Sequence, residues 1–299
     1  MSSAALSAAS TRATTGQTYA YLGPQGTYSH QAALAFTAQT PDAILTECSS
    51  IADIFDLVDR GRSSFGVVPI ENALEGSVNE TLDAFAFTSG AQILSELVID
   101  IHHDLIVRPG VTSSDIQTVI SHPQALGQCR RYLSEHLRGA LTQPANSTSE
   151  GVRQAIFDTD NTTAAIGTAL AAELFGGEVI ASQIEDHYGN QTRFVLIGNT
   201  PPPHLANPDE ASGYKTSLAL FMKEDRPGTL LMILEEFAYA GVNLSKIQSR
   251  PTKRALGDYM FWIDIEAHVD DQHVRTALDC LRLKLREVKS LGSYSGVLR

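Results

Sequence analysis

The sequence predicts an α/β protein followed by a smaller βαββαβ module with a ferredoxin-like fold. Between residues 19 and 175, short apolar runs repeatedly meet a small-residue turn and then a helical pattern, which is typical of α/β layers. After residue 213, the expected order becomes strand, helix, strand, strand, helix, strand. A chain of 299 residues is also long enough for two or three compact domains.

Strand-to-helix turns organise the front part of the chain. The expected pairs are 19–22 with 29–36, 65–70 with 77–85, 119–120 with 121–133, and 164–166 with 168–175. Ser77, Ser121 and Ser147 each precede Glu or Gln by three residues, which fits a capping box and predicts helix starts there. Such turns place helix N-termini along one edge of a sheet, where ligands of α/β proteins bind.

The back part follows the βαββαβ order closely. One helical face is marked by Val274, Leu278, Leu281 and Leu285, which repeat at helical spacing. The expected strands are 217–222, 244–248, 259–265 and a short terminal strand, and the expected helices are 227–240 and 271–288. These elements predict a ferredoxin-like module over residues 214–299.

The net charge changes sign near residue 213, where the expected order of elements also changes. Residues 1–213 hold nine Arg, no Lys and 23 Asp or Glu, a net charge of −14, whereas residues 214–299 hold 13 Lys or Arg and 11 Asp or Glu, a net charge of +2. An acidic, lysine-free front part argues against nucleic-acid or anionic-membrane partners and against lysine Schiff-base chemistry. We expect a linker at 199–213 and a disordered tail at 1–17, for which a transit peptide is the weaker alternative.

Cysteine usage indicates a reducing compartment. Cys48, Cys129 and Cys280 are scattered, without the CxxC pairing of a disulfide framework or a zinc site. We therefore expect a cytoplasmic protein with no bound metal. No apolar run approaches the roughly 18 residues that a membrane span requires. Nucleotide-binding, zinc-protease and serine-hydrolase motifs are missing from the sequence.

Four motifs in a fixed order carry the functional signal. They are Gly23-Pro24-Gln25-Gly26-Thr27-Tyr28-Ser29, Pro69-Ile70-Glu71-Asn72 with Gly76-Ser77-Val78, Ser121-His122-Pro123-Gln124-Ala125-Leu126 with Gln128-Cys129, and Asn190-Gln191-Thr192-Arg193-Phe194. With the βαββαβ module behind them, the chain resembles the prephenate dehydratase family from Tyr19 onward.

This resemblance implies a fold and a reaction. The implied fold has two α/β subdomains like those of a type-2 periplasmic binding protein, with the active site between them. Residues 18–198 would form this catalytic domain, subdomain 1 comprising about 18–103 and 186–198 and subdomain 2 about 104–185. The implied reaction converts prephenate to phenylpyruvate with loss of hydroxide and carbon dioxide, and it requires no cofactor.

The resemblance also assigns roles to residues. Thr192 would donate its hydroxyl proton to the departing oxygen, and Arg193 would either hold a substrate carboxylate or orient the loop through a backbone carbonyl or Glu71. The catalytic group is therefore Thr192, Arg193, Asn190 and Glu71. Because the domain lacks lysine, we expect helix N-termini and hydroxyls to bind the dianionic substrate. The expected binding residues are Thr27, Asn72, Ser77, Ser121, Gln124, Gln128, Ser147, Thr148, Ser149 and Phe194.

The back module resembles an ACT domain, which in this family binds phenylalanine between subunits. The likeness implies an effector site formed by Gly228, Thr229, Leu230, Asn243, Gln248, Ser249, Arg250 and Pro251. Thr229 and Gln248 depart from the usual Ala and Glu, and Gln248 would hold the ammonium group of phenylalanine less strongly. We expect a homodimer or homotetramer, and a monofunctional enzyme without a chorismate mutase segment.

Two other functions remain open from the sequence. Arogenate dehydratase runs the same elimination on an amino acid, and no residue in the sequence decides between the two substrates. A non-catalytic small-molecule sensor with an ACT domain is the alternative from another class of protein.

Overall fold

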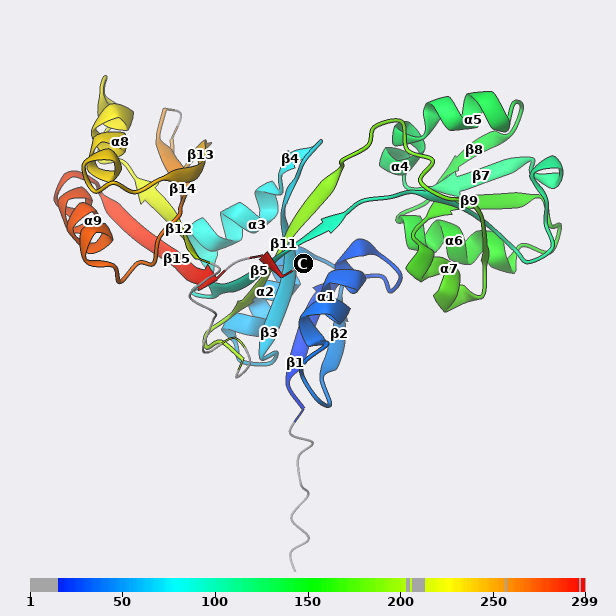
Figure 1. The fold of residues 1–299 in the computed structure, drawn as a ribbon, viewed down its shortest axis with the longest axis horizontal. Coiled ribbons are helices and arrows are strands. Elements are labelled where there is room, and N and C mark those ends of the chain that lie inside the picture. Colours follow the sequence, from blue (N-terminus) through cyan, green and yellow to red (C-terminus); the bar gives the residue numbers. More distant parts are fainter. Residues whose placement is uncertain (1–15, 203–204, 206–212, 256, 296, 299) are drawn as a thin grey trace, which may run out of the picture.

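The computed structural model describes residues 16–202, 205, 213–255, 257–295 and 297–298. Residues 1–15 of the predicted tail and most of the predicted linker lie outside these residues. Three sheets carry the described structure, arranged along the long axis of the molecule (Figure 1). Within the part of the chain that the structure describes, no helix combines the length and apolar character needed to cross a membrane.

The first sheet lies in the middle of Figure 1 and has the strand order β16-β5-β11-β3-β1-β2, with β4 paired to β3. Its strands are β1 (Thr18–Leu22), β2 (Ile44–Cys48), β3 (Phe65–Asn72), β4 (Gly76–Ser77), β5 (Gln92–Asp100), β11 (Gln191–Gly198) and β16 (Val297–Leu298). Its helices are α1 (Tyr28–Thr37), α2 (Ile51–Asp59), α3 (Asn79–Asp83) and the π-helix η1 (Ala84–Thr88).

The second sheet has the order β10-β6-β9-β7-β8. The chain enters it after β5 and returns to the first sheet at β11. The strands are β6 (Asp104–Val107), β7 (Thr118–Ser121), β8 (Leu141–Pro144), β9 (Thr163–Gly167) and β10 (Glu178–Ala181). The helices are η2 (Ser113–Asp115), α4 (Pro123–Gln128), α5 (Arg130–His136), α6 (Thr148–Phe157) and α7 (Ala169–Phe175). The prediction of one helix over 121–133 is wrong, because the chain leaves helical geometry at Cys129 (φ −117°, ψ 20°).

The C-terminal module has the predicted βαββαβ order and the sheet order β13-β14-β12-β15. Its elements are β12 (Tyr214–Phe221), α8 (Thr229–Tyr239), β13 (Leu244–Pro251), β14 (Tyr259–Ile265), α9 (Gln272–Lys284) and β15 (Glu287–Ser295). The second helix ends earlier than predicted, because Val288 belongs to β15. The chain then returns to the first sheet, where β16 pairs with β5.

Two of the three predicted capping boxes are wrong. Ser77 lies in β4, and the cap position of α3 is Val78, whose side chain makes no capping hydrogen bond. Ser121 ends β7, where its fully buried hydroxyl donates to the carbonyl of Ile166 at 2.6 Å and joins β7 to β9. For the third, the predicted helix start is confirmed, because Ser147 Oγ accepts a hydrogen bond from the Glu150 N–H at 3.0 Å. The Glu150 carboxylate accepts hydrogen bonds from Arg153 and Gln154, and only the serine half of the capping box is recorded.

The C-terminal module shares a hydrophobic core with the first sheet. One face of its own sheet packs on α8 and α9, through Ile233 and Leu278 among others. The opposite face buries Trp262 completely, and the indole lies edge-on to Phe85 of η1 with ring centroids 5.9 Å apart. Gly292 in β15 (φ +133°) permits the close approach of β15 to β5, because a Cβ atom there would collide with the backbone of Ile93 in β5.

Replacing Trp262 with Ala should therefore destabilise the whole protein by about 3–5 kcal/mol, since it opens a cavity between the module and the first sheet. Urea denaturation followed by far-ultraviolet circular dichroism measures this loss. The control is Leu283→Ala, which truncates a side chain that is 80% exposed on α9. A loss at Trp262 no larger than that of the control would contradict a shared core.

Candidate functional site

Asn72, Asn190 and Thr192 form a hydrogen-bonded group where β3 ends and β11 begins. The Asn72 side-chain amide donates to Thr192 Oγ1 at 2.8 Å and to Asn190 Oδ1 at 2.9 Å. Backbone pairing of β3 with β11 places Asn72 directly opposite Thr192. Both Asn190 and Thr192 are buried.

The Asn72 amide determines how the Thr192 hydroxyl can act. Asn72 Oδ1 accepts hydrogen bonds from the N–H groups of Leu74 and Glu75 at 2.9 and 3.0 Å. Those bonds fix the side chain with its NH₂ group toward Thr192. Because the Thr192 oxygen already accepts a hydrogen bond, its proton remains available for donation to a third group.

Arg193, the next residue on β11, turns to the opposite face and enters the C-terminal module. Its Nη1 lies 2.8 Å from Asp264 Oδ2 on β14, and its Nη2 donates to the Tyr294 hydroxyl on β15 at 2.6 Å. Its Nε lies 2.6 Å from Glu96 Oε2, at ion-pair distance but without hydrogen-bond alignment. Glu71, the side-chain partner that the resemblance suggested, is 3.9 Å away and makes the most distant of these contacts.

Three helix N-termini gather around the loop from Gly23 to Ser29. Thr27 caps α1, accepting from the His30 N–H at 3.3 Å and donating to the Pro24 carbonyl at 2.9 Å. Ser149, in the first turn of α6, donates to the Gln25 carbonyl. Thr168 caps α7 and donates to the Gly26 carbonyl at 2.7 Å.

Gly26 permits this close approach of the two sheets' helices. Its φ of +82° favours glycine, and a Cβ atom there would lie 2.8 Å from Ser149 Oγ and 3.0 Å from Ala171 Cβ. The loop follows β1, which runs parallel to β3. Both strands therefore end at the same edge of the first sheet, where Asn72 also lies.

Glu185 joins the two segments that connect the first and second sheets, one between β5 and β6 and the other between β10 and β11. Its carboxylate lies 2.8 Å from His102 Nδ1 and accepts a hydrogen bond from the His103 N–H at 2.9 Å. His103 Nε2 lies 2.8 Å from Gln128 Oε1, so Gln128 contacts this connection. Burial raises the pKa of Glu185, but the hydrogen bonds from His102 and from backbone N–H groups outweigh burial and lower it below 4.5.

Comparison with known proteins agrees with this arrangement. The prephenate dehydratase family model matches residues 19–202, and the ACT domain model matches residues 216–279. This chain belongs to the prephenate dehydratase family. The prephenate dehydratase of Methanocaldococcus jannaschii is 40% identical over 275 residues, which cover 92% of this chain and 96% of that protein.

Solved structures extend the likeness to three dimensions. The prephenate dehydratase of Arthrobacter aurescens in complex with L-Phe has a TM-score of 0.81 and 38% identity, over 93% of this chain and 90% of that one. GqqA, described as a novel type of quorum quenching acylase, has a TM-score of 0.80 and 28% identity, over 94% of this chain and 98% of that one. The predicted fold class, two α/β subdomains with a C-terminal ACT domain, is confirmed.

The ACT domain contacts the catalytic domain through two residues that the sequence assigned to the effector site. Gln248 Oε1 accepts a hydrogen bond from the Ser77 hydroxyl at 2.6 Å. The buried Arg250 binds Asn79 and Asp83. Alternate residues of β13 point in opposite directions, so Ser249 is exposed. Of the other predicted effector residues, Thr229 is half-buried, and the exposed ones are Gly228, Leu230, Asn243 and Pro251.

The remaining predicted binding residues have varied surroundings. Gln124 is exposed at the start of α4, and Thr148 is half-buried at the start of α6. Phe194 is buried in the core beneath α1 and has little accessible surface. Ser121, fully buried between two strands, has none.

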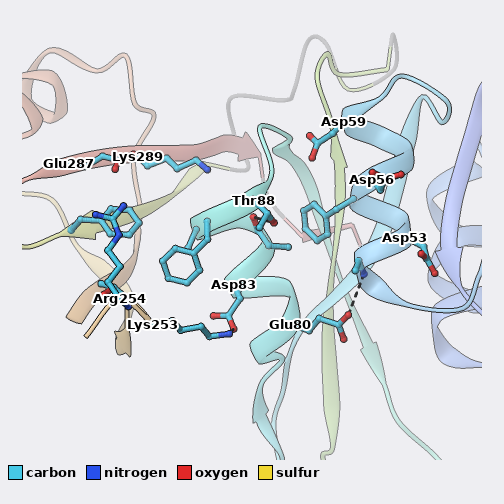
Figure 2. A pocket seen from close by; sticks show the side chains of 17 residues that line it. Asp53, Asp56, Asp59, Glu80, Asp83, Thr88, Lys253, Arg254, Glu287 and Lys289 are labelled. Carbon is cyan, nitrogen blue, oxygen red and sulfur yellow. Dashed lines mark hydrogen bonds and ion pairs between the residues drawn. The ribbon is translucent and has the colours of Figure 1, made fainter. Parts of the chain in front are cut away.

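A cavity of about 1010 Å³ is lined by residues of α2, of η1 and of the rim of the ACT domain (Figure 2). Its catalytic-domain wall carries Asp56 and Asp59, and its ACT wall carries Arg254 and Lys289. Lys253 closes one side by an ion pair with Asp83 at 2.5 Å. The cavity includes none of the predicted catalytic or effector residues.

Several residues that organise the site were missed by the sequence analysis. Thr168 begins the predicted helix 168–175 and could have been recognised as its cap. Glu96, Asp264 and Tyr294 lie in segments with ordinary strand patterns. Their importance arises only when the chain folds and brings them to Arg193.

The lowered pKa of Glu185 predicts a pH-dependent contribution to stability. The hydrogen bonds that its carboxylate makes with His102 and the His103 N–H stabilise the fold fully above pH 4.5, the ordinary pKa of a glutamate. They lose this effect as the pH falls through the lower pKa of Glu185 in the folded protein. Glu185→Gln should therefore reduce the free energy of unfolding at pH 7, and the difference from wild type should shrink on acidification. Urea denaturation between pH 7 and pH 3 measures it. Glu173→Gln, at an exposed site on α7, is the control, and a pH-independent difference at Glu185 would refute the prediction.

Proposed function

We propose that this protein is a prephenate dehydratase that converts prephenate to phenylpyruvate, water and carbon dioxide, with Thr192 as the proton donor. The observation that carries the proposal is the hydrogen bond from the Asn72 amide to Thr192 Oγ1. This bond leaves the Thr192 proton for the leaving oxygen of a substrate.

The reaction breaks two bonds of the substrate ring. The carboxylate on the ring leaves as carbon dioxide, and its bonding electrons enter the ring while the C–O bond to the hydroxyl breaks. Aromatisation drives both changes, so the enzyme mainly orients the ring and assists a poor leaving group. Because a threonine hydroxyl is a weak acid, Thr192 donates a hydrogen bond or transfers its proton in concert with C–O cleavage.

Backbone N–H groups at the helix N-termini supply the binding of the substrate carboxylates in this proposal. The catalytic part is strongly acidic, so local donors must outweigh its general field. Thr27 and Ser149 donate their hydroxyl protons to loop carbonyls and so hold the loop in place. Thr27, Ser147 and Thr168 each cap one first-turn N–H group of α1, α6 and α7. The other first-turn N–H groups of these helices are the donors that we assign to the substrate carboxylates.

Domain bounds, assembly and regulation complete the proposal. The catalytic domain comprises residues 18–198 and the ACT domain residues 214–299, in a cytoplasmic homodimer or homotetramer. Strand β13 is an edge of its sheet with an exposed face, and an ACT pairing there would place Ser249 and Pro251 beside a second copy. L-phenylalanine is the effector proposed for this surface, because the related Arthrobacter aurescens protein was solved in complex with it.

Three other functions make different demands on the same residues. Arogenate dehydratase would require recognition of an ammonium group, and a parallel assay with prephenate and arogenate separates the two substrates. Amide hydrolysis, suggested by the likeness to GqqA, would require a base at the nucleophile, whereas the hydrogen bond described at Thr192 comes from an amide donor. A sensor would bind these acids without turnover.

Replacing Thr192 with Val should lower kcat for prephenate by about 100-fold or more, because the proton donor is lost while the side-chain volume is nearly kept. Absorbance of phenylpyruvate at alkaline pH measures turnover. Thr142→Val, at an exposed position on β8, provides the matched control. An unchanged kcat in a folded Thr192→Val variant would remove Thr192 from the mechanism.

A further inference from the structure

Asp264 of the ACT domain is fully buried and is surrounded by hydrogen-bond donors. Its carboxylate accepts hydrogen bonds from Ser217 Oγ at 2.7 Å, from Trp262 Nε1 at 2.9 Å and from Arg193 Nη1 at 2.8 Å. Two of these donors belong to the ACT domain, and Arg193 belongs to the catalytic strand β11. The carboxylate therefore joins the core of one domain to the strand that carries Thr192.

Tyr294 makes a second connection to the same arginine. Its hydroxyl lies 2.6 Å from Arg193 Nη2 and 2.8 Å from Ser217 Oγ. Tyr294 is also buried in the shared core, so its ring is held by packing and its hydroxyl by two hydrogen bonds. Asp264 and Tyr294 together occupy both terminal nitrogens of the Arg193 guanidinium.

The charged side chains around Arg193 have no net charge as a group. Arg193 and Lys215 are the cations, and Glu96 and Asp264 are the anions, with Lys215 Nζ 2.6 Å from Glu96 Oε1. Arg193, Glu96 and Asp264 have side-chain exposures of only 11%, 2% and 0%. Removing one partner would leave a buried charge without compensation, which forces the remaining partners to move or to admit water.

Any movement of Arg193 would be transmitted to Thr192 through the backbone of β11. The two residues share one peptide bond, and their side chains leave β11 on opposite faces. The pairing of β11 with β3 shifts by one residue just after Arg193. This bulge interrupts the regular ladder at the start of the strand. The ladder of β11 with β5 stays regular through Thr192 and Arg193. On the β3 side, where the ladder is interrupted, the Arg193 side chain adds a constraint on the backbone that carries Thr192.

We propose that Asp264 and Tyr294 of the ACT domain are positioning residues for the dehydratase reaction, which they support by holding Arg193 and thereby directing the Thr192 hydroxyl. This inference rests on the proposed role of Thr192. It assigns the ACT domain a part in catalysis in the absence of any effector. A ligand that moves β14 or β15 would alter turnover through the same contacts.

The test measures prephenate turnover by two variants. Asp264→Asn removes the charge at nearly constant shape, and Tyr294→Phe removes only the hydroxyl. Each should lower kcat on the order of tenfold with little change in KM, because a small displacement of a reacting group is costly while substrate contacts persist. Asp83→Asn is the matched control. It breaks another buried contact between the domains, the pair with Arg250. It should leave kcat within about twofold of wild type, because the recorded hydrogen bonds of Asp83 and Arg250 do not involve Arg193 or Thr192.

A double-mutant cycle separates positioning from a general loss of structure. Each variant is combined with Thr192→Val, and residual turnover is followed with enzyme in excess over prephenate. If Asp264 and Tyr294 act through Thr192, their effect on kcat should disappear in the Thr192→Val background. An equal decrease in both backgrounds, or an unchanged kcat in the single variants, would overturn the inference.

Two further outcomes are also decided by this design. If Asp264→Asn does not fold, Tyr294→Phe provides the same comparison, because it leaves every charge in place. If Thr192→Val alone retains full turnover, the proposed function of Thr192 fails. That result differs from failure of the inference, in which Thr192→Val is slow and the ACT variants turn over normally.

Discussion

The ion pair between Arg193 and Asp264 joins the catalytic strand to the regulatory domain, and much of the arrangement depends on it. One strand residue places a hydroxyl beside Asn72, and the next places a guanidinium in the ACT core. The two-residue period of a strand makes this division possible, since neighbouring side chains face opposite sides of the sheet. The proposed chemistry of Thr192 would therefore depend on the packing around Arg193.

Charge separation along the sequence has a structural role in this interface. The catalytic part has no lysine, and lysines of the ACT domain neutralise its carboxylates. Lys215 binds Glu96 at 2.6 Å, and Lys246 binds Glu71 at 2.8 Å. Lys289 donates to the carbonyls of Phe85 and Ser89 at 2.6 and 2.8 Å. The lysines of the ACT domain thus bind acidic side chains and carbonyls of the catalytic part. These contacts add to the burial of Trp262 between the two domains.

Local patterns predicted the elements, and motif order predicted the family. The apolar periods gave the βαββαβ order correctly, and the Asn190–Phe194 motif pointed to Thr192. Ser77 and Ser121 were misread because a capping box considers only the residues that follow. Both residues instead belong to strands whose pairing partners, Glu71 and Pro144, lie outside that pattern. The partners of Arg193 could not be predicted, since Asp264 and Tyr294 follow it by 71 and 101 positions in strands with no distinguishing motif.

Hydrogen exchange at β11 is the most direct measurement of this coupling. Mass spectrometry would compare the peptide covering residues 191–198 in wild type and in Asp264→Asn, with peptides from β7 and β9 as internal references. If the ACT carboxylate holds the catalytic strand through Arg193, exchange should become faster in the β11 peptide and stay unchanged in the references. Unchanged exchange at β11, or an equal increase in all three strands, would contradict the account.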